Sequence, residues 1–192
     1  MKIETERLII RPFQKGDDQP TLSRVLGQDF GHSTVEDVAL KGLQSWLHWQ
    51  NLNDEWFPKM LQPPYGDRAI TLKSNGLLIG AVGYVPCLAP FSLIPELKNM
   101  QTTLGEFTPE LGLFYAVDPE HQRRGYATEA ACAMIEHAFN HLQVGRVIAM
   151  TDYSNTASQK VMQKLGMTIL RNPTPQPPWL QVVGVLYNRK NS

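Results

Sequence analysis

The sequence has few cysteines, no excess of either charge and no long apolar run. Its two cysteines, Cys87 and Cys132, belong to no CxxC pattern, which disfavours a disulfide framework and a zinc site. Lysine plus arginine total 18, as do aspartate plus glutamate. The chain therefore has no net positive field to attract nucleic acid or anionic membranes, and we expect neither as a partner.

Metal ligands are also sparse. Among the five histidines, His137 and His141 are spaced i,i+4, as two ligands on one helix face would be. No third candidate ligand lies nearby in the sequence. We interpret the pair as part of a surface helix and expect no metal cofactor.

Targeting signals are equally absent from the pattern. No apolar stretch approaches the roughly 20 residues that cross a bilayer. The opening MKIETERLIIRPF carries charges throughout, unlike the apolar centre of a signal peptide. These features predict a cytoplasmic protein.

The chain has an ordinary globular composition, with 42% apolar and 19% charged residues among 192. That length suits one domain with a substantial core. No internal repeat or low-complexity segment interrupts it. We predict a single domain over residues 1–192.

The sequence pattern of the first half predicts strands and helices. Residues 8–13 form a β-rich run ended by a proline, and Asp17-Asp18 offer N-caps for a helix to about Gly27. Ser33 and Glu36 form a capping box before a second helix. Residues 54–66, rich in proline and aromatics, predict an irregular loop. Asn75-Gly76 between two β-rich runs predicts a hairpin of 68–73 and 77–85.

The second half follows a long connection, 86–106, whose apolar content favours a packed lid. The patterns predict strands at 110–117, 146–151, 167–170 and 180–187. They predict helices at about 125–142 and 155–165. The fold class is α/β (α+β): a mixed, mostly antiparallel central sheet flanked by helices.

The stretch YAVDPEHQRRGYATEAA (115–131) places a helix start directly after a strand. Helix N-termini carry free N–H groups and partial positive charge, which suit phosphate. Gly125 permits close backbone approach, and Arg123 and Arg124 add charge. The P-loop and GxGxxG patterns are absent. The turn thus indicates a pyrophosphate cradle, with an ordinary loop–helix junction and a solvated basic face as the alternative.

A second helix start follows the next strand, in TDYSNTASQKVMQKLG (151–166). Neighbouring strands whose helices begin at one sheet edge form a crevice there. A long ligand can then place its diphosphate on the first helix and an amide-bearing arm between the strands. Asn155 and Ser158 would border that arm, although Asn155 also suits simple N-capping.

Three blocks resemble the GNAT superfamily of N-acetyltransferases. QRRGYA (122–127) is similar to its Q-x-x-G-x-[GA] signature. GYATEA, NTASQKVMQKLGM (155–167) and TERLIIRPF (5–13) resemble the RimJ/RimL-type branch, the ribosomal-protein N-terminal acetyltransferases and their relatives. The blocks occur in the family's order and, with the sheet pattern between them, span nearly the whole chain.

The resemblance implies a GNAT-like domain with a splayed central strand pair and acetyl-CoA as cosubstrate. The pantetheine arm would pair with the strand end, where the N–H of Val117 would also stabilise the oxyanion. The 3′-phosphate would meet Arg123, Arg124 or Lys160. The residues implied in acetyl-CoA binding are Tyr115, Ala116, Val117, Gln122, Arg123, Arg124, Gly125, Tyr126, Ala127, Thr128, Asn155, Ser158 and Lys160.

The implied reaction is direct attack of a primary amine on the acetyl thioester, through a tetrahedral intermediate. The amine must first lose a proton. Glu110 matches the glutamate of the family's E-[IL]-G motif, but two extra residues before Pro119 shift it about 7 Å along its strand. Glu106 is the reserve, and a surface carboxylate is the alternative for Glu110. Met162 fills the place of the family's proton-donating tyrosine, which leaves three alternatives: Ser158, Tyr153, or a thiolate that departs without a proton donor.

The acceptor is a small amine or a protein N-terminus, and the sequence does not choose between them. Residues 34–66 and 86–106 would build its pocket, with core packing as the alternative for each aromatic lining candidate: Trp46, Trp49, Trp56, Phe57, Tyr65 and Phe91. The pattern is compatible with a monomer or a homodimer. Two alternatives stay open: an inactive acyl-CoA-binding regulatory module and a structural or partner-binding domain.

Overall fold

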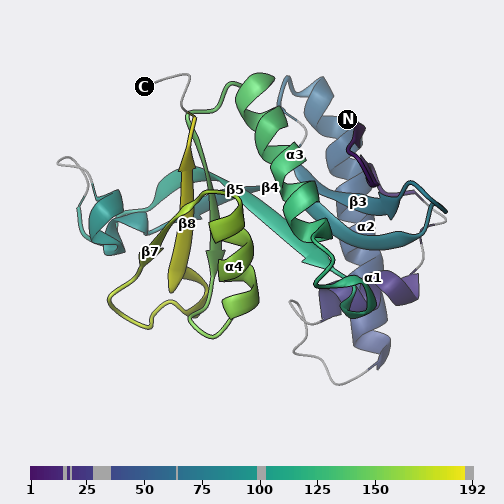
Figure 1. The fold of residues 1–192 in the computed structure, drawn as a ribbon. Coiled ribbons are helices and arrows are strands. Elements are labelled where there is room, and N and C mark those ends of the chain that lie inside the picture. The colour runs from purple at the N-terminus through teal and green to yellow at the C-terminus, as the bar shows by residue number, and fades with distance from the viewer. Residues whose placement is uncertain (15–16, 18, 28–35, 64, 99–102, 189–192) are drawn as a thin grey trace. The chain divides into compact units, whose positions relative to one another are not determined.

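The computed structural model describes residues 1–14, 17, 19–27, 36–63, 65–98 and 103–188. Among them, strands hydrogen-bond in the order β1-β2-β3-β4-β5-β6-β8-β7. Strands β5 and β6 run parallel, with Gly112 opposite Ile148. The pairs β1–β2, β2–β3, β3–β4, β6–β8 and β7–β8 are antiparallel. The predicted mixed, mostly antiparallel sheet with flanking helices is confirmed (Figure 1).

The chain forms two units, and the boundaries between them fall within β4, β5 and α3. The first unit comprises Met1–Tyr84 and Phe114–Met134, and the second Val85–Leu113 and Ile135–Ser192. Elements of the first unit are β1 (Ile3–Glu4), β2 (Leu8–Arg11), α1 (Gln19–Gly27), α2 (Glu36–Lys59), β3 (Gly66–Leu72) and η3 (Pro119–His121). The elements that contain these boundaries are β4 (Leu78–Ala89), β5 (Thr108–Val117) and α3 (Tyr126–Asn140).

The core of the first unit joins α1 and α2 to strands β3 and β4. Leu22 and Leu43 represent the helices in this core, and Ala69 and Ala81 represent the strands. The two alanines are directly opposite each other in the antiparallel ladder, so they leave room for the larger helix side chains. The predicted Asn-Gly hairpin is confirmed, with Gly76 at φ 73° joining β3 to β4.

Helix α2 corrects one prediction, because it continues through residues 54–59, where an irregular loop was expected. The buried positions just before this stretch are polar: Gln50 and Asn53. The apolar periodicity therefore ends before the helix does. Pro58 lies in the last turn, where it removes at most one helical hydrogen bond. The Ser33 cap lies outside the described residues.

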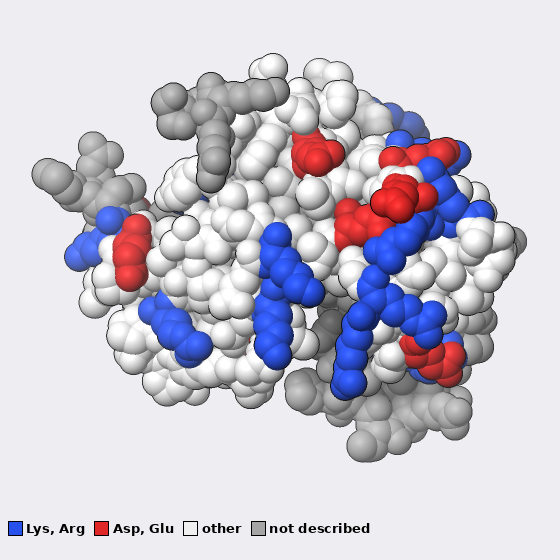
Figure 2. Space-filling model, in the orientation of Figure 1, with Lys and Arg blue, Asp and Glu red and all other residues white. Residues whose placement is uncertain are grey.

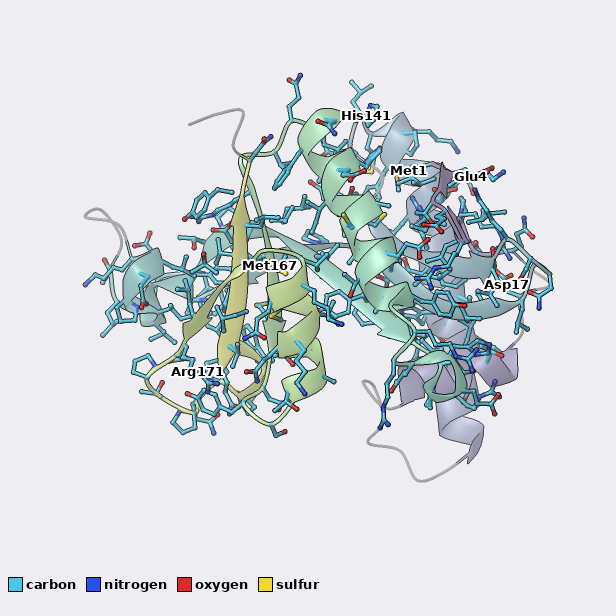
Figure 3. All side chains as sticks on the ribbon, viewed as in Figure 1. Met1, Glu4, Asp17, His141, Met167 and Arg171 are labelled. Atoms are coloured by element: carbon cyan, nitrogen blue, oxygen red, sulfur yellow. The ribbon has the colours of Figure 1, made fainter. Side chains whose placement is uncertain are left out.

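The second unit contains the remaining elements and its own core. They are η1 (Phe91–Leu93), η2 (Pro95–Leu97), β6 (Arg146–Thr151), α4 (Thr156–Lys164), β7 (Thr168–Arg171), η4 (Pro178–Leu180) and β8 (Val182–Tyr187). Figure 3 labels Met167, which follows α4, and Arg171, which ends β7. The helix and strand predictions for 146–187 are confirmed to within two residues at each end.

The 86–106 segment is packed rather than extended into solvent, over the part that the structure describes. Phe91 is 1% exposed and Ile94 is fully buried, in a cluster with Cys87, Val183 and Val185. Phe91 is thus a core residue of the second unit, which agrees with the alternative of core packing and not with a pocket-lining role. An apolar side chain suits both a pocket wall and a core, so the sequence alone does not distinguish the two positions.

Candidate active site

The end of β5 presents the three residues predicted to meet the pantetheine arm: Tyr115, Ala116 and Val117. Strand β4 supports them closely, because a Cβ on Gly80 would clash with the Ala116 carbonyl oxygen. The N–H that follows, on Asp118, donates to the Ile79 carbonyl at 2.8 Å. A glycine at position 80 is therefore needed to bring the two backbones this near.

Asp118 fixes the turn that follows the strand. Its side chain is 1% exposed and accepts from Arg24 Nη2 at 2.7 Å and Nε at 3.1 Å. It also accepts from the Glu120 N–H at 3.1 Å, capping η3. Burial raises the pKa of this carboxyl, but the Arg24 and Glu120 hydrogen bonds and the nearby positive charges outweigh burial and hold the pKa below its usual value. An ionised carboxylate thus anchors the turn.

The turn itself contains two left-handed residues before α3 begins. Arg123 has φ 61° and Gly125 has φ 85°, and glycine adopts that region without steric cost. Gln122 Nε2 donates to the Val117 carbonyl at 3.0 Å. The structure thereby brings the signature glutamine against the predicted oxyanion strand. Figure 1 follows the chain from β5 through η3 into α3.

The N-terminus of α3 has the chemistry of an anion site. The Glu129 N–H donates to the Gly125 carbonyl at 3.0 Å, so the preceding N–H groups of Tyr126, Ala127 and Thr128 have no acceptor within the helix. Residues 122–125 are exposed, and two of them are arginines. Backbone donors, positive charge and an absent side chain at Gly125 all suit a diphosphate.

Sequence reasoning missed two residues that hold this turn, Arg7 and Glu129. Arg7 Nη1 donates to the Arg124 carbonyl at 3.0 Å, and Nε donates to Glu129 Oε2 at 2.7 Å. The Arg7 guanidinium also lies 4.6 Å from the Tyr126 ring centroid. Both residues belong to motifs quoted above, TERL and GYATEA, but nothing in either motif says that they pair.

Asn155 lies in the second unit, at the N-terminus of α4. Its Oδ1 accepts from the Ser158 N–H at 3.0 Å, so the N-cap prediction is confirmed. Asp152 prepares this cap, since its Oδ1 accepts from the N–H groups of Ser154 at 2.8 Å and Asn155 at 2.9 Å. The hydrogen bonds from Ser154 are the main reason that the pKa of Asp152 is lowered.

Three other predicted residues of the second unit differ in exposure. Lys160 is exposed on α4 and Ser158 is half-buried. Met162 is fully buried, with its sulfur 2.9 Å from where a Gly184 Cβ would lie. The position of the family's tyrosine is therefore a packing position in this chain. Tyr153, a suggested substitute, donates its hydroxyl to the carbonyls of Asn172 and Thr174.

Glu110 forms an ion pair with Arg146 within the second unit. Its side chain is 6% exposed, and both carboxylate oxygens accept from the guanidinium, Oε2 at 2.9 Å from Nε. These bonds are the main cause of the raised pKa of Arg146. A carboxylate held this way must share its lone pairs with Arg146 before it can accept a proton. The reserve candidate, Glu106, is exposed and accepts from the Thr103 N–H at 2.7 Å.

The aromatic candidates on and near α2 lie in three environments. Trp46 packs edge-on against Phe13, with ring centroids 5.0 Å apart, on the core of the first unit. Phe57 and Tyr65 form a second edge-on pair at 5.6 Å. Trp49 and Trp56 are 58% and 52% exposed. The last two are thus free of the core.

Neither a membrane-spanning helix nor a metal-binding cluster occurs among the described residues. None of their helices combines the length and the apolar composition that crossing a membrane would require. They contain no group of three or more His, Cys, Asp or Glu side chains placed to hold a metal ion. His137 and His141 lie with ring centroids 5.1 Å apart, and Figure 3 labels His141 at the end of α3.

Comparison with known proteins identifies relatives over most of the chain. The sequence model of the acetyltransferase (GNAT) domain matches residues 7–168. The uncharacterized N-acetyltransferase YnaD of Bacillus subtilis is 41% identical over 171 residues, which cover 87% of this chain and 82% of YnaD. YjdG of the same organism, also named an uncharacterized N-acetyltransferase, is 32% identical over 183 residues, covering 94% and 97%.

Solved structures share the fold. An acetyltransferase from Agrobacterium tumefaciens has a TM-score of 0.66 at 22% identity, covering 97% of this chain and 94% of that one. RimL, a ribosomal L7/L12 α-N-protein acetyltransferase solved with coenzyme A, has a TM-score of 0.56 at 12% identity, covering 97% and 98%. The family match, the close relatives and the arrangement of strand, turn and helix agree: the chain belongs to the GNAT acetyltransferase domain family.

Proposed function

We propose that the protein transfers the acetyl group of acetyl-CoA to a primary amine, by direct attack through a tetrahedral intermediate. The observation that carries this proposal is the turn between β5 and α3. Gln122 binds the Val117 carbonyl there, and Gly125 exposes the start of α3. Strand end and helix start are thus held together as a thioester and a diphosphate on one ligand would require.

Each part of acetyl-CoA has a proposed contact. The diphosphate would lie on the amides of residues 122–128, and the pantetheine arm along Tyr115, Ala116 and Val117. The Val117 N–H would stabilise the oxyanion, because a fixed donor gains most where charge develops. Asn155 and Ser158 would border the arm, and Arg123, Arg124 or Lys160 would meet the 3′-phosphate. Ser158 is the proposed proton donor to the leaving thiolate.

We keep Glu110 as the proposed general base. Its pairing with Arg146 holds the carboxylate in a fixed orientation, and the amine would have to compete with the guanidinium for one oxygen. A base shared in this way is expected to act through a hydrogen-bonded water. Glu106 is the exposed carboxylate that remains if Glu110 is only structural.

The proposed acceptor is a small amine or a protein N-terminus, and the proposed branch is the RimJ/RimL type. RimL, a structural neighbour, is a ribosomal L7/L12 α-N-protein acetyltransferase. At neutral pH an α-amine, with a pKa of about 8, is less protonated than a side-chain amine at about 10, so α-amines are the first acceptors to test. We further propose that the protein is a monomer or a homodimer and that it acts in the cytoplasm.

Thermal unfolding with acetyl-CoA tests the cradle. A ligand at 100 times its Kd adds about 2.7 kcal/mol, which raises Tm by roughly 5–10 °C in a domain of this size. We expect that shift in the parent and none in Gly125→Glu, whose Cβ would lie 3.4 Å from Arg7 Nη2 and disturb the turn, and whose carboxylate would repel the diphosphate.

The matched control is Gly76→Glu. Gly76 is also exposed and left-handed, at φ 73°, with no atom within 4 Å of its would-be Cβ. It therefore carries the same backbone strain and charge outside the cradle, and it should keep the acetyl-CoA shift. An equal shift in the Gly125 and Gly76 variants would refute the cradle.

The second candidate function is an acyl-CoA-binding regulatory module with little turnover. The pairing of Glu110 with Arg146 and the burial of Met162 favour it, because both weaken the proton-transfer apparatus. Release of CoA thiol with a panel of α-amines and side-chain amines separates the two. Acetyl-CoA binding with no thiol release from any amine would establish the module.

If thiol is released, Glu110→Gln tests the base. We expect kcat to fall and to lose its decline toward acidic pH, while the acetyl-CoA thermal shift is unchanged. Glu106→Gln is the comparison variant, since it removes the reserve carboxylate, which accepts from the Thr103 N–H. Parallel kcat–pH profiles for parent and Glu110→Gln would remove Glu110 from catalysis.

A further inference from the structure

Arg7 makes several side-chain contacts around the start of α3. Besides Nε to Glu129 Oε2 at 2.7 Å, its Nη2 lies 2.6 Å from the same oxygen. Its own backbone N–H donates to Glu129 Oε1 at 2.9 Å, and Thr5 Oγ1 donates to that oxygen at 2.5 Å. The two short N-terminal strands are thereby tied to a helix more than 100 residues later.

The partners of Arg7 bracket Gly125. Arg124, whose carbonyl accepts from Nη1, precedes the glycine, and Tyr126, whose ring receives the guanidinium face, follows it. A Cβ on Gly125 would lie 3.4 Å from Arg7 Nη2. The guanidinium therefore rests directly against the left-handed residue that aims the first amides of α3. Its loss would free both the Arg124 carbonyl and the Tyr126 ring.

Arg7 also determines the electrostatics of the cradle. Glu129 lies in the first turn of α3, so its negative charge is close to the proposed diphosphate. Burial raises the pKa of this carboxyl, but the bonds from Thr5 and Arg7 outweigh burial and lower the pKa. Glu129 is thus ionised at neutral pH, and without Arg7 its charge would repel an anionic ligand.

We propose that Arg7 is a positioning residue for acetyl-CoA, fixing the turn at Gly125 and neutralising Glu129 beside the diphosphate. This inference rests on the proposed function, because it assigns the diphosphate to the α3 start. It gives the TERL segment a role in binding acetyl-CoA, although that segment would not itself contact the ligand.

The test compares two ligands, acetyl-CoA and S-acetylpantetheine, which carries the thioester arm but no diphosphate. For Arg7→Gln we expect the Kd of acetyl-CoA to rise roughly tenfold to a hundredfold, the usual effect of losing charge-assisted hydrogen bonds. The Kd of S-acetylpantetheine should stay within about twofold, since that ligand leaves the cradle empty. Equal losses for both ligands would reduce Arg7 to a purely structural residue and overturn the proposal.

Two further variants separate the roles of Arg7. In Arg7→Gln/Glu129→Gln the repelling carboxylate is gone, so acetyl-CoA affinity should recover in part, with the remainder reporting the loosened turn. No recovery would overturn neutralisation. Arg7→Lys keeps the charge with fewer donors, so it should bind acetyl-CoA more tightly than Arg7→Gln. If Arg7→Gln does not fold, the Kd values of acetyl-CoA and S-acetylpantetheine can be compared in Arg7→Lys instead.

Arg11→Gln is the matched control. Arg11 forms a comparable pair with Asp17, at 2.6 Å and 3.0 Å, from the neighbouring strand β2. Its loss should lower Tm without changing the ratio of the two Kd values. A parent protein that binds no acetyl-CoA would refute the proposed function and this inference together, whereas parent binding with an unaffected Arg7→Gln would refute the inference alone.

Discussion

Asp67 and Arg68, neighbours at the start of β3, are both almost completely buried. Gln50 contacts Asp67 through two bonds: its Oε1 accepts from the Asp67 N–H at 2.7 Å and its Nε2 lies 3.5 Å from Oδ2. Among the residues that the structure describes, neither Asp67 Oδ1 nor Arg68 Nε has a hydrogen-bond partner. Arg68 Nη2 lies 2.9 Å from Asp54 Oδ1 in poor hydrogen-bond geometry. A buried charged group without hydrogen-bond partners lowers the free energy of unfolding.

Asp67 therefore predicts an unusual dependence of stability on pH. Burial raises its pKa to about 7 against the opposing charge of Arg68. The folded state then holds its proton more tightly than the unfolded state, with a pKa of about 3.9. Stability should fall as pH rises from about 4 to about 7, by at most ~4 kcal/mol from this group. Urea unfolding at a series of pH values should show this slope in the parent and not in Asp67→Asn.

Asp118→Asn provides the opposite sign. The lowered pKa of Asp118 means that its stabilisation is present above the unfolded pKa and is lost as pH falls through the folded pKa. This variant should be less stable than the parent at neutral pH, while Asp67→Asn should be more stable. Identical pH profiles for Asp67→Asn and the parent would contradict the assignment of the raised pKa.

At the scale of elements, α4 depends on its cap. It has nine residues, so its end groups are a large share of its hydrogen bonds. Asn155→Ala removes the acceptor of the Ser158 N–H and should cost about 1 kcal/mol, or roughly 2–4 °C in Tm. Asn155→Asp keeps an acceptor and adds charge at a helix N-terminus, where it is favourable, so it should retain the parent Tm.

Thermal unfolding without ligand measures both variants. If Asn155 acts only as a cap, the acetyl-CoA affinity of Asn155→Ala should fall by no more than its lower stability explains. A larger loss would support its proposed place beside the pantetheine arm. An unchanged Tm in Asn155→Ala would contradict the cap itself.

Most elements could be predicted from the sequence because local signals determine them. The Asn75-Gly76 turn, the Asn155 cap and the apolar runs of β5 and β6 are such signals. The end of α2 could not, because buried Gln50 and Asn53 have polar side chains at inward positions. The cradle turn was visible as a motif. Its support by Arg7 was not, since a pair 122 residues apart has no local pattern.

At the scale of the whole molecule, positive and negative charges balance, with 18 of each. Figure 2 shows basic and acidic side chains on the same face, several of them side by side. Long-range attraction of an anionic ligand therefore depends on local charge rather than on the net field. In the first unit the exposed arginines at 123 and 124 supply it.

This balance predicts how acetyl-CoA association responds to salt. The association rate constant of the parent should fall as ionic strength rises beyond ~0.1 M, where the Debye length is about 10 Å. In Arg123→Gln/Arg124→Gln it should be lower and nearly independent of salt. Lys2→Gln/Lys59→Gln removes the same charge from positions outside the cradle and should behave like the parent in stopped-flow measurements. Equal salt dependence in all three proteins would exclude local steering.

The bond between Arg7 and Glu129 also has a consequence for the order of folding. It closes a loop of 122 residues, and contacts of such separation form late because loop closure costs entropy before any contact repays it. A nascent chain can display β2 long before α3 exists. Acetyl-CoA would thus bind only the completed protein, so the appearance of binding during refolding should report the last long-range contacts to form.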